Sequence, residues 1–415
     1  MQRALRYLLP PLIALAALAQ TGTRDRYFLR YPFDKWEEEA AQAQVKWTVR
    51  VFQAHLSPHQ RLIARVEIEV DGREVEKRRG RGELVFFLEV TDAAGHKWRT
   101  HQAWDLRRVP KESRGRTVTF GQDAFVLPGD YRIALAVCDT QTLEHSFLRR
   151  AMHVAPLRGD PLPEAWGGMP AVEFPRLYGF PELWFQPGAI GRLRLPLATR
   201  QPVHIELLMN LTPSERASGS VQTFRRNMSI LLPAMKVLCG IDPAGGSVDL
   251  TLLDMTRRVT WEQNARGLDW ARIREPFASS NPGVIDVQSL AAKAAMKQFF
   301  RDQILDRAKP RATEPLTAII VLSAPVFLGH QDQLERDNIP KDPNRRVFYL
   351  CYRPLQVRPV FVPGSDGLQR PVVTAIPTDD LEHALKGLDP RVLSASTPEQ
   401  FRKAIATVLT EISRM

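Results

Sequence analysis

The sequence lacks the common signatures of catalysis. No G-x-S-x-G, P-loop or G-x-G-x-x-G motif occurs, so neither a nucleophile elbow nor a phosphate cradle is indicated. His55 and His59 stand four residues apart, but Pro58 lies between them and the Glu of H-E-x-x-H is missing. The sequence therefore predicts a protein that is not an enzyme.

Cysteine is scarce. The three cysteines of the 415-residue chain are widely spaced, and no two form a C-x-x-C pair, which disfavours structural zinc and thioredoxin-like chemistry. In an exported protein two of them could pair, and simple buried thiols are the alternative. They are Cys138, Cys239 and Cys351.

Long apolar runs are also missing, because the longest candidate, Tyr7–Leu18, is shorter than the about 20 residues that span a bilayer. Arg3 and Arg6 precede this run and a small-residue pattern ending at Ala19 follows it, which is typical of a secretory signal peptide over residues 1–19. A retained anchor is the alternative. We expect a periplasmic or secreted bacterial protein without a transmembrane segment after signal cleavage.

The charge is basic but dispersed. The formal net charge is +11, and its basic clusters, such as Arg107-Arg108 and Arg225-Arg226, are separated and lack interleaved aromatics suited to base stacking. Specific nucleic-acid binding is therefore not expected. Solvated surface charge explains the pattern, and attraction to anionic envelope surfaces is the alternative.

Composition and length predict a folded, multidomain protein. The hydrophobic fraction of 44% and the charged fraction of 25% are those of globular proteins, and 415 residues exceed what one core usually organises. After a short segment at 20–44, with a helical stretch at 36–44, apolar and polar residues alternate in short runs over 45–155. Turn signals such as Asp71-Gly72 separate these runs, so we expect an antiparallel β-sandwich. Residues 125–139 resemble the penultimate strands of immunoglobulin-like or fibronectin-like modules.

The C-terminal half follows a different pattern. A proline-rich and aromatic-rich connector at 156–202 is expected to pack against one or both domains. From 203 to 415, buried strands such as 203–209 and 316–322 alternate with helices. This order predicts an α/β domain with a doubly wound, mostly parallel sheet.

The first of these strands ends in Asn210-x-Thr212-x-Ser214. A strand feeding such oxygen-bearing side chains resembles the opening of the von Willebrand factor type A fold, and the order of elements over 203–415 fits it. The resemblance is to divergent type A related proteins of bacterial cell envelopes. In that family the loop reads D-x-S-x-S and holds a divalent cation, which receives a carboxylate from the partner.

The resemblance implies a degenerate metal site. The family adds a Thr from a second loop and an Asp after the fourth strand, but Val284 and Ser323 stand at the matching positions here. Asn210 also replaces the leading Asp. Because Mg²⁺ and Ca²⁺ usually need a carboxylate, we expect no metal cofactor. Mg²⁺ or Ca²⁺ at Asn210, Thr212 and Ser214 is the alternative, with Asp254 or Asp286 supplying the missing charge; Asp286 also suits a helix N-cap.

These observations predict an exported, non-enzymatic protein that binds a protein partner in the cell envelope through its type A-like domain. One alternative is a cation-dependent adhesion protein, and a second is an exported hydrolase with a cleft between its domains. The expected binding face consists of Asn210, Thr212, Ser214, Asp286 and Ser323.

Overall fold

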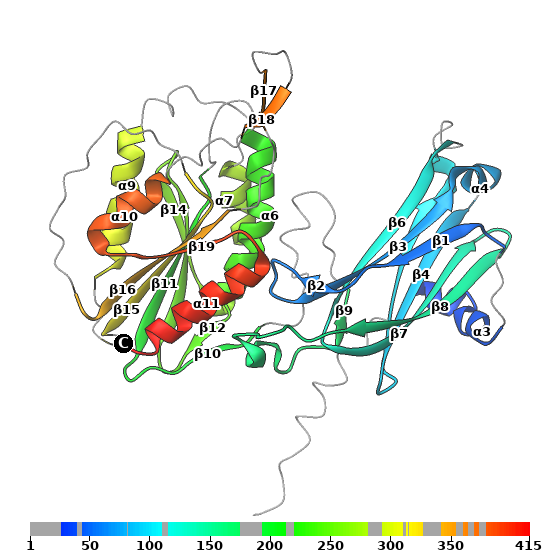
Figure 1. The fold of residues 1–415 in the computed structure, drawn as a ribbon, viewed down its shortest axis with the longest axis horizontal. Coiled ribbons are helices and arrows are strands. Elements are labelled where there is room, and N and C mark those ends of the chain that lie inside the picture. Colours follow the sequence, from blue (N-terminus) through cyan, green and yellow to red (C-terminus); the bar gives the residue numbers. More distant parts are fainter. Residues whose placement is uncertain are drawn as a thin grey trace, which may run out of the picture. The chain divides into compact units, whose positions relative to one another are not determined.

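The computed structural model describes two compact units (Figure 1). The structure describes residues 26–39, 44–80, 82–109, 115–174, 193–212, 220–280, 293–309, 313, 315–326, 342–353, 360–363, 369–372 and 379–415. The signal peptide expected at 1–19 lies outside them. The first unit comprises Met1–His55, Leu62–Leu157 and Pro170–Pro175, and the second comprises Leu56–Arg61, Arg158–Met169 and Arg176–Met415. Their folds confirm a multidomain chain with a β-sandwich and an α/β domain.

Two antiparallel sheets form the first unit. One has the order β5-β4-β7-β8, and the other has the order β1-β3-β6-β9 with β2 paired to β3. The strands are β1 (Trp47–Val51), β2 (His55–Leu56), β3 (Leu62–Asp71), β4 (Glu83–Asp92), β5 (Lys97–Asp105), β6 (Thr117–Val126), β7 (Gly129–Asp139), β8 (His145–Val154) and β9 (Val172–Glu173). Phe86 of one sheet lies 6.4 Å from Phe120 of the other between ring centroids, so the inner faces pack together.

The outer face of β4 is buried as well. Val85 and Phe87 point away from the inter-sheet core, and two short helices, α2 (Arg26–Arg30) and α3 (Phe33–Glu38), cover them with aromatic side chains. Phe28 and Phe33 lie 5.1 and 5.8 Å from Phe87 between ring centroids. Burial on both faces explains why the sequence of β4 is almost continuously apolar rather than alternating.

Two local predictions for this unit were wrong. The helical stretch expected at 36–44 ends at Glu38, because Glu39 is already extended. The turn expected at Asp71-Gly72 is the start of a helix, α4 (Gly72–Lys77), in which the Asp71 carboxylate accepts a hydrogen bond from the Arg73 N–H. Asp before Gly is as good a helix N-cap as a turn signal, and the residues alone did not distinguish the two.

A six-stranded sheet organises the second unit, in the order β14-β13-β11-β15-β16-β19. All its pairings are parallel except β13 with β14. The strands are β11 (Val203–Asn210), β13 (Ser247–Asp254), β14 (Val259–Asn264), β15 (Leu316–Ser323), β16 (Arg345–Tyr352) and β19 (Arg391–Ala395). Counted along the chain this order is 3-2-1-4-5-6, one of the common doubly wound arrangements.

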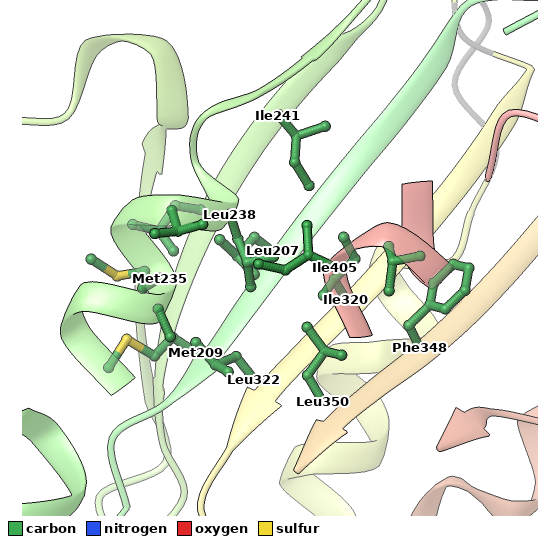
Figure 2. Close-up of a cluster of buried hydrophobic side chains, with 14 of the residues drawn as sticks. Leu207, Met209, Met235, Leu238, Ile241, Ile320, Leu322, Phe348, Leu350 and Ile405 are labelled. Carbon is green, nitrogen blue, oxygen red and sulfur yellow. The ribbon is translucent and has the colours of Figure 1, made fainter. Parts of the chain in front are cut away.

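Helices cover both faces of this sheet (Figure 1). They are α6 (Ser220–Leu238), α7 (Trp270–Ser280), α9 (Lys293–Arg307), α10 (Asp380–Leu385) and α11 (Pro398–Ile412). On one face, Leu207 and Met209 of β11 pack with residues of α6 and α11 such as Met235 and Ile405 (Figure 2). On the other face, Leu208 packs with Phe300 of α9. Two small sheets complete the unit, β10 (Leu195–Leu197) with β12 (Ile241–Pro243) and β17 (Val360–Pro363) with β18 (Gln369–Val372).

Two segments that precede the α/β region in the sequence, Leu56–Arg61 and Arg158–Met169, belong to the second unit and contribute contacts to α11. Arg402 of α11 is buried and forms a two-point ion pair with Asp160, at 2.5 and 2.8 Å. Its guanidinium also lies 4.7 Å from the centroid of the Trp166 ring, whose Nε1 donates to the Gln60 carbonyl. The proline-rich connector is thus partly built into the α/β unit: residues 158–169 belong to it and 170–175 to the sandwich.

Cys138, Cys239 and Cys351 all fall within the described residues, and none of them forms a disulfide. None of the described helices is long and apolar enough to cross a bilayer.

Substitution of Glu89 is expected to destabilise the sandwich. This fully buried carboxylate pairs with Lys97 at 3.0 Å and with Arg99 at 2.7 Å. Glu89→Ala removes two buried charge-assisted hydrogen bonds and leaves Lys97 with only Glu37 and Arg99 with only Asp34, so it should lower the free energy of unfolding by about 2 kcal/mol. Glu144→Gln is the control, because Glu144 is exposed and Arg78 keeps Glu74 and Asp139, so its effect should stay below about 1 kcal/mol. Equal effects of the two substitutions in chemical denaturation would contradict this assignment.

His59 should make stability depend on pH. Burial, with Lys236 and Arg61 nearby, lowers the pKa of His59 from 6.5 to about 3. The unfolded chain therefore takes up a proton first on acidification, so this contribution is present above pH 6.5 and is lost as the pH falls from 6.5 towards 3, by up to about 1.4 kcal/mol per pH unit. Denaturation across this range should show a shallower slope for His59→Gln than for wild type or for the exposed control His55→Gln; parallel curves would refute the prediction.

Candidate functional site

The carboxyl ends of β11, β13 and β15 form the candidate site. β11 lies at the centre of the sheet, paired with β13 on one side and β15 on the other, and the strand order reverses direction beside it. Open α/β sheets bind ligands outside the carboxyl ends of their strands at this reversal. Asn210 ends β11 and Ser323 ends β15, so the sheet brings together two of the predicted face residues that are far apart in sequence.

Asn210 links these two strand ends. Its Oδ1 accepts a hydrogen bond from the Thr212 N–H at 2.9 Å, and its Nδ2 donates to the Ser323 Oγ at 2.9 Å. The backbone N–H fixes which side of the amide is oxygen, so the amino group must face Ser323. The Ser323 hydroxyl in turn donates to the Ala324 carbonyl at 2.5 Å. All of these side chains are buried, and the amide acts as a donor and an acceptor at once.

The loop after β11 is tied to the end of β13. The Thr212 Oγ1 accepts a hydrogen bond from the Met255 N–H at 2.8 Å. Asp254, also buried, accepts from the Ser280 hydroxyl at 2.8 Å and from the Arg257 N–H at 3.1 Å. A carboxylate therefore does lie at this edge of the sheet, and it is held by the end of α7 and by the β13–β14 turn.

Two residues of the predicted face, Ser214 and Asp286, lie outside the described residues, as does Val284, which stands where the family has its second-loop Thr. Among those described, Asn210 and Ser323 are in direct contact, and Thr212 is bonded to Asn210 through its backbone. The oxygen atoms of Asn210 and Thr212 that were considered as metal ligands each accept a hydrogen bond from a backbone N–H.

A second buried polar cluster lies on the neighbouring strand, where Cys351 pairs in register with Ser323. The Asp379 carboxylate accepts a short hydrogen bond from the Tyr349 hydroxyl and one from the Cys351 thiol at 3.3 Å, and it caps α10. Burial raises the pKa of Cys351 to about 11. Burial also raises the pKa of Tyr349 well above its ordinary value. The thiol stays protonated at neutral pH, so it is not a ready nucleophile.

This cluster was not predicted from the sequence. Asp379 carried the signal of a helix N-cap, being followed by Asp380 and Leu381, but nothing in the sequence indicates that it meets Tyr349 and Cys351.

The exposed turn that the structure describes at this edge is basic. The turn between β13 and β14 presents Arg257 and Arg258, and Val259 beside them is 37% exposed. Asp254, the last residue of β13 before this turn, is buried and accepts a hydrogen bond from the Ser280 hydroxyl. What the edge offers to solvent in the described turn is therefore positive charge and an apolar side chain.

Comparison with known proteins gives little guidance. No family model matches the sequence, and no curated protein sequence matches it. Among solved structures, a structural-genomics target is 12% identical, with 28% of this chain and 89% of that chain covered and a TM-score of 0.18. The ApaA protein of Bordetella pertussis is 11% identical, with 28% and 96% covered and a TM-score of 0.17. A glycosyl hydrolase family 2 member of Bacteroides cellulosilyticus is 8% identical, with 75% and 42% covered and a TM-score of 0.19. Scores this low carry no argument about function.

Replacing Asn210 by Asp tests the linking role of its amide. Asp cannot donate to Ser323, and the Ser323 hydroxyl can turn to the carboxylate only by leaving the Ala324 carbonyl. Without added cation, Asn210→Asp should lower the free energy of unfolding by about 1–3 kcal/mol, the cost of a buried unsatisfied polar group. The exposed Asn344→Asp is the control and should change it by less than about 0.5 kcal/mol. A fully stable Asn210→Asp protein in chelator would contradict the assignment.

Proposed function

We propose that this protein is an exported, non-enzymatic binding module that contacts a protein partner of the bacterial envelope through the carboxyl edge of a von Willebrand type A-like domain. Support for the fold comes from the order 3-2-1-4-5-6 with a single antiparallel strand, β14. Support for export comes from the signal-like sequence of residues 1–19.

The observation that carries the proposal is the Asn210–Ser323 hydrogen bond at the point where the strand order reverses. A type A domain that uses a cation needs oxygen ligands directed at the metal and at least one carboxylate among them. Here the amide of Asn210 is turned to Ser323 and to the Thr212 N–H, and the nearby carboxylate of Asp254 is engaged by Ser280. Recognition at this edge then depends on shape, hydrogen bonding and charge.

The basic charge of the described β13–β14 turn indicates which class of partner this edge would bind. Arg257 and Arg258 are exposed at the β13–β14 turn, beside the exposed Val259. Such a surface suits an acidic protein segment that carries an apolar residue, because opposite charges speed encounter and the apolar contact adds affinity. The sandwich, similar in our proposal to immunoglobulin-like or fibronectin-like modules, serves as a spacer or second contact surface.

A comparison of two double variants tests the proposed edge. Arg257→Glu with Arg258→Asn reverses its charge, and Asn suits the left-handed backbone of residue 258 (φ 59°). Arg107→Glu with Arg108→Asn is the control, a similarly exposed pair in the sandwich. Cross-linking of the mature chain in envelope extracts should give a specific partner with wild type and with the control pair, and should lose it with the edge pair.

The same experiment separates the alternative functions. Retention of the partner by the edge variant, or capture of nothing by wild type, would overturn the proposal. Loss of the partner on addition of chelator, with restoration by magnesium or calcium, would instead favour the cation-dependent adhesion protein.

A further inference from the structure

A buried polar cluster lies at the other end of β11. His204 and Glu206 share one face of the strand with Leu208 and Asn210, since side chains alternate between faces. Across the ladder, His204 is in register with Ser247 and Glu206 with Asp249 of β13. This end of the sheet therefore places an imidazole and two carboxylates on one face, within a unit whose other strand residues are largely apolar.

Close approach of the two strands brings these groups together. Gly246 precedes β13, and a Cβ atom there would lie 2.1 Å from the Val203 carbonyl oxygen. Only glycine fits at this point. One ligand atom each from His204, Glu206 and Asp249 then falls within 4.8 Å of the others.

Other groups hold the Glu206 carboxylate by one of its oxygens. The Oε1 atom accepts a hydrogen bond from the Thr251 hydroxyl at 2.5 Å and one from Arg307 Nε at 3.2 Å. Arg307, near the end of α9, also forms a short ion pair with Glu262. The second oxygen, Oε2, faces His204 Nε2 at 3.3 Å.

That separation fits a shared metal ion better than a strong hydrogen bond. A charge-assisted N–H···O bond is usually about 2.7–2.9 Å long. Zinc holds histidine nitrogen and carboxylate oxygen at about 2.0–2.2 Å, so two ligands of a tetrahedral ion lie about 3.3–3.5 Å apart. His204 Nδ1 contacts the Ser247 hydroxyl at 2.9 Å, the kind of contact that orients a metal-binding imidazole through its other nitrogen.

One further observation points to a bound ligand. Thr317 is in register with His204 on β15, on the same face, and is 2% exposed. Within the described part of the chain its Oγ1 has no hydrogen-bond partner. A buried hydroxyl of this kind needs a partner, which a metal-bound water would provide.

We propose that His204, Glu206 and Asp249 bind one zinc ion, with water as the fourth ligand, at the amino end of β11. Arg307, Thr251 and Ser247 orient these ligands. The site is distinct from the carboxyl edge proposed above for partner binding and does not depend on that function. It stabilises the α/β unit by cross-linking β11 to β13 at the end opposite Asn210.

Titration of the full chain with zinc tests this site. The purified protein is stripped with chelator, dialysed and titrated with zinc chloride by calorimetry, and thermal unfolding is followed in parallel. We expect one zinc per chain and a melting temperature that rises with zinc concentration, because the ion binds the folded state. Absence of stoichiometric binding by the folded wild-type chain would overturn the proposal.

Variants then assign the binding to these residues. Asp249→Asn, which alters a half-buried ligand, and His204→Gln should each weaken zinc binding by at least about tenfold. Asp242→Asn and His153→Gln are matched controls at exposed positions and should bind as wild type does. Far-ultraviolet circular dichroism and the unfolding curve in chelator confirm that each variant is folded. Equal zinc affinity of wild type and both ligand variants would refute the assignment.

Cobalt substitution provides a readout that does not depend on variant folding. Imidazole and carboxylate ligands should give visible ligand-field bands without intense thiolate charge-transfer absorption in the near ultraviolet. Strong thiolate absorption would place the metal on Cys239 or another cysteine and would overturn the proposed ligand set.

Discussion

The second unit depends on one constraint: β11 is buried on both faces and hydrogen-bonded along both edges. All eight of its residues are buried. A polar side chain in such a strand must find its partners inside the protein, because an unpaired buried polar group costs free energy. β11 nevertheless contains His204, Glu206 and Asn210 on one face, and the surrounding elements supply partners for each: Ser247 and Arg307 at one end, and Ser323 at the other.

Much of the fold could be predicted from local patterns. The strands at 203–209 and 316–322 are mostly apolar because helices cover both faces of the sheet, and this pattern does not depend on the rest of the chain. The ends of the short elements were less accessible to prediction. The helix α3 ends at Glu38 although the residues that follow also favour a helix. Its stability comes from the packing of Phe33 and Trp36 on the sandwich rather than from helix propensity, so the helix does not extend beyond these contacts.

At the candidate sites, residue types could be predicted from the sequence, but contacts between distant residues could not. Asn210 and Thr212 could be found from a motif of five residues, and Ser323 from the end of its strand. Their geometry could not, because Asn210 meets a residue 113 positions away. His204 and Glu206 were overlooked inside an apolar strand, although two polar residues spaced by two share one face, which was the available signal. The register of β11 with β13 brings Asp249 and Thr251 beside them, and the position of the end of α9 brings Arg307 there. Neither could be read from local sequence.

The ion pair between Arg402 and Asp160 also bears on where this chain could be divided into separate folding units. Its two residues are 242 positions apart, yet both belong to the α/β unit, and the loop 56–61 contributes a hydrogen bond from Gln60 to Pro398 of the same helix. Residues 203–415 alone would therefore contain a buried guanidinium without its carboxylate. The boundary between the two folds is therefore not a single cut in the sequence, because the α/β unit includes segments that lie within and after the sandwich sequence.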